Sequence, residues 1–156
     1  MSNENEFQNT RKATALISDA GYPLPIELRP IWRIGLICLA IQESSKDGQT
    51  LKLNKVRFLL WMLIRPQKWD SYYDCLHGYD DSIISMSSDK STEKAVELAI
   101  SKNFVRLDSD SLTLSVEGDN LLQLARDLKM FQRETEFLHT VKNKVTDTYI
   151  KRILGN

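Results

Sequence analysis

The chain has 156 residues, of which 42% are hydrophobic, and its 21 Lys and Arg residues balance 21 Asp and Glu residues. A chain of this length fits one domain and can bury a substantial core. With a formal net charge of zero, nothing in the overall charge indicates binding to nucleic acid or to an acidic substrate. The longest apolar run, residues 34–41, is far shorter than the roughly 20 residues of a membrane span. No secretory segment precedes the polar start, so we expect a soluble cytoplasmic protein.

Residues 1–28 are expected to form an N-terminal arm with one short helix. Ala13, Leu16, Ile17 and Ala20 have helical spacing, and Gly21 would end the helix. Prolines at positions 23, 25 and 30 then favour an extended chain, because proline disfavours helix at the residue before it. We expect the folded domain to begin at residue 29 and to continue to residue 156.

Two strongly apolar helices are predicted at residues 30–45 and 54–64, and a third helix at residues 67–76. The first two are apolar on nearly every side, which is typical of helices that are buried all round. The terminal helices or another protein must cover this apolar surface, because large exposed patches are uncommon on monomers. A homo-oligomer or an obligate partner is therefore expected.

The region from residue 79 to residue 127 predicts a helix, a hairpin and a return to helix. A loop at residues 79–88 is expected to hold a first short strand at 83–86, and a helix follows from Ser91. Two short alternating runs, 104–107 and 111–115, predict the hairpin, whose core residues would be Phe104, Leu112 and Leu114. Gly118 then marks the start of the next helix. This order is typical of a winged helix-turn-helix, so the predicted fold is mainly α with a small β-hairpin and extra terminal helices.

The C-terminal part predicts one long helix from residue 119 to about residue 144. Its apolar residues fall near heptad spacing; they are Leu121, Leu124, Leu128, Phe131 and Leu138. A last helix is predicted at residues 147–154.

The charge of residues 79–128 opposes DNA binding by the winged helix. Five Lys and Arg stand against ten Asp and Glu in this region, whereas DNA affinity depends mainly on cations that neutralise phosphates. The residues that DNA contact would use are Lys90, Lys94, Lys102 and Arg106. Asp89, Glu93 and Glu97 alternate with them, which is typical of an exposed helix face with i, i+4 ion pairs.

The helix at residues 54–64 carries the candidate partner interface. An aromatic pair, Phe58 and Trp61, is flanked by Lys55, Arg57 and Arg65. Aromatic residues surrounded by cations are typical of interface hot spots, and an acidic coiled coil would complement them. The alternative is that both aromatic side chains fill the core of the monomer.

No catalytic, cofactor-binding or metal-binding motif is evident. The glycines are isolated, so no phosphate-binding loop is predicted. Asp74, Cys75 and His77 lie close in sequence, but a metal site needs three or four ligands, and the only other histidine is His139. Cys38 lies in the most apolar helix and is expected to be an inert core thiol. We therefore expect no enzyme activity and no cofactor.

Three segments resemble the small middle component of bacterial ABC-three-component defence systems, a group that includes Lamassu-type systems. These segments are residues 29–40, residues 53–63 and the Leu-Thr-Leu-Ser-Val-Glu-Gly run at 112–118, and the resemblance covers roughly residues 29–127. The resemblance implies a winged-helix accessory subunit that joins an SMC-like coiled-coil ATPase to an effector such as a nuclease. Its association with DNA would be indirect, through the complex.

The function predicted from the sequence is therefore a non-catalytic subunit that acts by protein–protein contact in an anti-phage or anti-plasmid complex. The main alternative is a winged-helix transcriptional regulator that binds DNA and dimerises through its long C-terminal helix. A small toxin or antitoxin partner is a third hypothesis that the sequence neither supports nor excludes.

Overall fold

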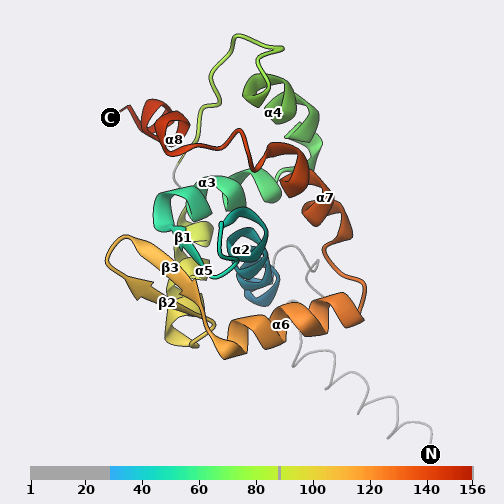
Figure 1. Ribbon diagram of the computed structural model, residues 1–156, viewed down its shortest axis with the longest axis vertical. Coiled ribbons are helices and arrows are strands. Elements are labelled where there is room, and N and C mark those ends of the chain that lie inside the picture. Colours follow the sequence, from blue (N-terminus) through green and yellow to red (C-terminus); the bar gives the residue numbers. More distant parts are fainter. Residues whose placement is uncertain (1–28, 88, 156) are drawn as a thin grey trace, which may run out of the picture.

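The computed structural model describes residues 29–155 except residue 88, and the predicted helix at residues 13–20 lies outside these residues. The described part is mainly helical, with seven α-helices and one three-stranded antiparallel sheet. Figure 1 shows α2 at the centre, the hairpin at one side, and α4 and α8 at the end opposite α6. The prediction of a mainly α fold with a small β-hairpin is confirmed.

Helix α2 (Pro30–Ser44) forms the centre of the core. Pro30 occupies its first turn, where the missing amide N–H costs nothing. Eight consecutive residues, 34–41, are buried, because α3, α5, α6, α7 and the sheet all pack against α2. For residues 34–41 the prediction that this helix is buried on every side is confirmed, and elements of the same chain provide the cover, whereas Ile31 at the start of the helix is exposed.

The first strand is β1 (Thr50–Lys52), so the prediction of a first strand at residues 83–86 is wrong. β1 pairs with β3 (Ser111–Leu114), which also pairs with β2 (Val105–Asp108), in the order β1-β3-β2. Because β3 lies between these two strands, both of its edges are occupied. Residues 81–87 form an irregular loop in which Ile84 is buried and Ile83 is exposed.

Helix α3 (Leu53–Leu63) begins one residue before the prediction, and its second half is buried. Residues 58–63 are all buried, since α2, α4 (Trp69–Leu76), α5 and α8 contact different sides of α3. A short 3₁₀ turn, η2 (Pro66–Lys68), leads from α3 into α4. The indole N–H of Trp69 donates to the carbonyl oxygen of Met62 at 2.9 Å, which ties α4 to the end of α3.

Helix α5 (Lys90–Ser101) precedes the hairpin and packs against α2. Leu112 and Leu114 are buried, and Thr113 between them contacts Thr50 across the sheet through their hydroxyl groups. The predicted placement of the two leucines in the core is confirmed. Phe104 is only half-buried, because it lies before β2, where the chain leaves α5.

The prediction of one long helix over residues 119–144 is wrong. The chain forms α6 (Val116–Asp127) and α7 (Gln132–Val141), and α8 (Asp147–Leu154) follows with the predicted bounds. Lys129 and Phe131 have positive φ angles of 57° and 65°, a conformation that ends a helix. The break lets the ring of Phe131 pack against Gly35 and Trp32 of α2. Burial of this aromatic side chain outweighs continuation of the helix.

Candidate partner-binding interface

The acidic residues at the start of α5 pair with other helices and not along α5. The carboxylate of Asp89 lies 3.3 Å from the guanidinium of Arg33 in α2. Glu93 forms a two-point ion pair with Arg57 of α3, with N–O distances of 2.8 and 2.9 Å. For these two residues, the prediction of i, i+4 pairs along an exposed helix face is therefore wrong.

The four DNA-contact candidates are all exposed, and the structure distributes them over α5 and the hairpin. Lys90 and Lys94 lie in the first half of α5, Lys102 caps its end, and Arg106 lies in β2. Glu97 is also exposed on α5. Because Asp89 and Glu93 are engaged elsewhere, the outer face of α5 is more basic than the sequence indicated.

The hairpin tip is acidic, as its sequence indicates. Asp108 and Asp110 flank the turn and are both exposed, and Ser109 between them has a positive φ of 58°. The turn would bring these two carboxylates close to any phosphate backbone that the hairpin approached, and like charges repel.

Asp89 also caps α5, and its surroundings lower its pKa. Burial raises the pKa of the Asp89 carboxyl, but hydrogen bonds from the Ser91 N–H and the Thr92 hydroxyl, together with Arg33, outweigh burial and hold the pKa below its ordinary value. The charged form of Asp89 therefore stabilises both the start of α5 and its contact with α2.

The aromatic pair predicted as an interface hot spot lies in the core. Phe58 is 1% exposed and Trp61 is 7% exposed, and the ring of Trp61 packs 5.2 Å from that of Tyr72 in α4. The guanidinium of Arg65 lies 4.5 Å from the centre of the Trp61 ring and donates to the Trp61 carbonyl oxygen. The prediction that Phe58 and Trp61 are surface anchors is wrong, and the core alternative is right.

The cations beside that pair are largely occupied within the chain. Arg57 binds Glu93, and Arg65 covers Trp61. Lys55 is half-buried, and burial lowers the pKa of its ammonium group. The predicted interface on α3 therefore offers a partner little accessible surface.

An exposed apolar groove lies instead between the start of α2 and the outer side of α6. Ile31 is 48% exposed, Leu124 is 54% exposed and Leu128 is 62% exposed. With Trp32 and Leu121 they line a groove of about 180 Å³, which we call the α2–α6 groove. The sequence signal was the heptad-like leucine spacing in residues 121–128, which indicated an apolar helix face but not its exposure.

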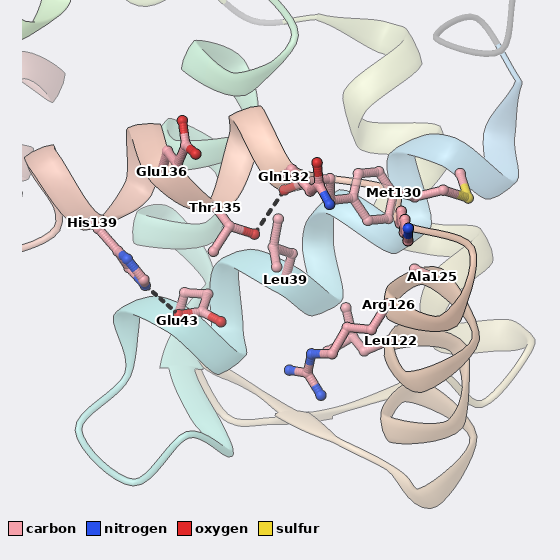
Figure 2. A pocket seen from close by; sticks show the side chains of 12 residues that line it. Leu39, Glu43, Leu122, Ala125, Arg126, Met130, Gln132, Thr135, Glu136 and His139 are labelled. Carbon is pink, nitrogen blue, oxygen red and sulfur yellow. Dashed lines mark hydrogen bonds and ion pairs between the residues drawn. The ribbon is translucent and has the colours of Figure 1, made fainter.

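A larger cleft lies on the other side of α6, between α6 and α7 with α2 beneath them (Figure 2). This α6–α7 cleft has a volume of about 460 Å³. Leu39, Leu122 and Phe131 form its apolar base, and Arg126 and Lys129 lie on the α6 side. On the side formed by α2 and α7 the polar residues are Glu43, Gln132, Thr135, Glu136 and His139.

One contact between side chains of α7 and α2 closes the far end of the α6–α7 cleft. Nε2 of His139 lies 2.8 Å from a carboxylate oxygen of Glu43, as Figure 2 shows. Arg126 extends across the base and donates to the side-chain oxygen of Gln42. The hydroxyl of Thr135 donates to the carbonyl oxygen of Phe131 at 2.7 Å, so this hydroxyl is engaged by the backbone. The sequence pattern had singled out neither the cleft nor its charged residues.

Asp74 and Cys75 lie in the last turn of α4, and His77, which follows that helix, makes contacts of its own. His77 binds the carbonyl oxygen of Thr140 at 2.8 Å and stacks on Tyr73. Within the described part of the chain, no group of three or more His, Cys, Asp or Glu residues is placed to hold a metal ion. Burial raises the pKa of the Cys38 thiol to about 12, so Cys38 stays protonated at neutral pH.

No helix among the described residues combines the length and the apolar character that crossing a membrane requires. Comparison with protein-family models, with curated proteins and with solved structures found no match for this chain.

Proposed function

We propose that the chain is a non-catalytic winged-helix accessory subunit that works by binding other proteins. Its partners are an SMC-like coiled-coil ATPase and an effector such as a nuclease, in an anti-phage or anti-plasmid complex. The exposed α2–α6 groove carries the proposal, since contiguous apolar surface on a folded domain marks a site of protein contact. The resemblance of three segments to the middle component of ABC-three-component systems supports the choice of partners.

The order of the elements supports the winged-helix part of the proposal. A winged helix-turn-helix runs helix, strand, helix, helix and hairpin, with the first strand paired to the second strand of the hairpin. The elements α2, β1, α3, α5, β2 and β3 follow that order, and β1 pairs with β3. η2 and α4 are then an insertion between the second and third helices.

The decisive experiment is co-purification with an SMC-like ATPase encoded by a neighbouring gene. The double variant Leu124→Lys and Leu128→Lys places two charges in the α2–α6 groove, and both side chains are exposed, so we expect it to fold and to lose the ATPase. Val116→Lys is the matched control, because Val116 is 71% exposed at the start of the same helix and outside the groove. Retention of the ATPase by the folded double variant contradicts the proposal.

A second candidate function, a DNA-binding transcriptional regulator, is favoured by one observation. The pairing of Asp89 and Glu93 with Arg33 and Arg57 leaves Lys90 and Lys94 without acidic partners on α5. Fluorescence anisotropy with a labelled DNA duplex separates the two functions. The accessory subunit alone should bind duplex DNA weakly at physiological salt. Micromolar or tighter binding that weakens steeply with salt favours the regulator.

A further inference from the structure

The charges around the α6–α7 cleft are segregated by helix. The α6 side bears Arg126 and Lys129, and the carboxylates of Glu43 and Glu136 lie on the side formed by α2 and α7. Arg133, the one arginine of α7, is directed elsewhere, since its guanidinium lies 5.4 Å from the centre of the Trp69 ring. The cleft therefore has an apolar base between one basic rim and one acidic rim.

These rim charges are incompletely neutralised within the described chain. Arg126 binds a neutral acceptor, Gln42. Glu43 is paired only with His139, and no ion pair is formed by Lys129 or Glu136 among the described residues. Incompletely neutralised charges on the two rims of an apolar base provide electrostatic selection of what enters the cleft.

The α6–α7 cleft and the α2–α6 groove share part of their lining. Ala125, Met130 and Phe131 line both the α6–α7 cleft and the α2–α6 groove. A small molecule would use polar groups that converge on one point, whereas here the charges are spread along two rims. An elongated occupant matches this arrangement better than a compact one.

We propose that the α6–α7 cleft receives one face of an amphipathic helix from a partner protein. The apolar stripe of that helix contacts Leu39, Leu122 and Phe131, an acidic edge lies over Arg126 and Lys129, and a basic edge lies over Glu43 and Glu136. Apolar anchors at i, i+3 and i+4 are the usual mode of helix-in-groove recognition. This inference rests on the proposed function as a partner-binding subunit and names the chemistry of one partner segment.

The proposal determines the direction of the bound helix as well as its composition. A helix turned end for end exchanges its two edges, so the positions of the acidic and basic edges select one direction. A helix with two acidic edges or two basic edges meets a like-charged rim in both directions, and like charges in an interface cost binding energy.

Three synthetic peptides test the proposal with the full-length chain. Each has about 18 residues, roughly five helical turns, the same leucine stripe and a fluorescent label. One has glutamates along one edge and lysines along the other, one has glutamates along both edges, and one has lysines along both. Fluorescence anisotropy should show the mixed-edge peptide binding at least about tenfold more tightly than the other two, a difference of about 1.4 kcal/mol.

The double variant Arg126→Glu and Lys129→Glu gives the cleft two acidic rims, so its preference should switch to the peptide with lysines along both edges. The matched control is Lys142→Glu with Lys144→Glu, which makes the same change in net charge outside the cleft and should keep the preference for the mixed-edge peptide. Equal affinity of the native chain for all three peptides overturns the proposal, as does a switch in the control or the absence of binding. The proposed function is tested separately. Loss of the ATPase from the Leu124→Lys and Leu128→Lys variant would support that function even if the peptide experiment overturns the proposal for the cleft.

Discussion

Gly118, in the first turn of α6, lies directly against the carbonyl oxygen of Phe104, and a Cβ atom at position 118 would overlap that oxygen. Ser115 connects the same two residues, because its hydroxyl donates to the Phe104 carbonyl at 2.9 Å and accepts the Gly118 N–H at 3.1 Å. The end of β3 and the start of α6 are thereby fixed to the start of β2. This contact is the physical reason for serine and glycine three residues apart after the hairpin.

Gly118→Ala is expected to lower the free energy of unfolding by about 1–3 kcal/mol, because overpacking against a backbone oxygen forces the chain to shift. Chemical denaturation measures the loss. Asn120→Ala, at an exposed position of the same helix, is the control and should change the free energy little. Equal stability of the two variants would mean that α6 tolerates displacement from β2.

Leu114→Ala should lower the free energy of unfolding by roughly 2–5 kcal/mol, since Leu114 is 4% exposed and its removal leaves a cavity beneath the hairpin. Leu107→Ala removes the same side chain from the neighbouring strand, where it is 46% exposed, and should cost much less. Thermal or denaturant unfolding of both variants measures the difference. A similar cost at the two positions would contradict the packing of the hairpin described above.

Trp61→Ala should unfold or severely destabilise the chain by itself, with a cost of roughly 3–5 kcal/mol. The reason is that Trp61 fills the space between α3 and Tyr72 of α4. Arg65→Ala removes the cation above the same ring and should cost only about 0.5–1 kcal/mol. Circular dichroism and denaturant titration test both variants. Native stability of the Trp61→Ala variant would contradict the core role of Trp61 and favour the prediction that it contacts a partner.

Asp89→Ala should destabilise the protein by about 0.5–2 kcal/mol at neutral pH, the usual cost of losing an N-cap. The pKa of Asp89 is lowered in the folded state, so its contribution is present above the ordinary carboxyl pKa of about 3.9 and is lost as pH falls through the folded pKa. The difference between Asp89→Ala and the native chain should therefore shrink as the pH falls below the ordinary carboxyl pKa. Asp81→Ala, in the exposed loop, provides the control; a difference independent of pH would exclude the charged cap.

Cys38 should resist thiol reagents in the folded protein. It is fully buried and its thiol stays protonated, because burial raises its pKa to about 12. Cys75 is half-buried, and burial and nearby aspartates raise its pKa as well, so it should react slowly. Titration with a chromogenic disulfide should detect only Cys75 in the native state and both thiols after unfolding. Rapid modification of Cys38 without unfolding would show that α2 is accessible.

The sequence determined those elements whose signals are local. The apolar runs of α2 and α3, the alternation of Leu112 and Leu114, and the bounds of α8 at 147–154 all follow from side-chain periodicity within a few residues. The acidic hairpin tip also follows directly from its composition. For the candidate site, the sequence led us to expect a partner interface at Phe58 and Trp61 of α3, and the structure places both side chains in the core.

Only the tertiary structure decided which apolar residues are covered. β1 has a single buried residue, Leu51, and it becomes a strand because β3, some 60 residues later, provides its hydrogen-bonding partner. Trp61 is buried because α4 packs against it, and the break before α7 arises because the ring of Phe131 lies against Gly35. Periodicity shows that a helix face is apolar, but the elements that pack against that face decide whether it becomes core or remains exposed, as Leu124 and Leu128 do.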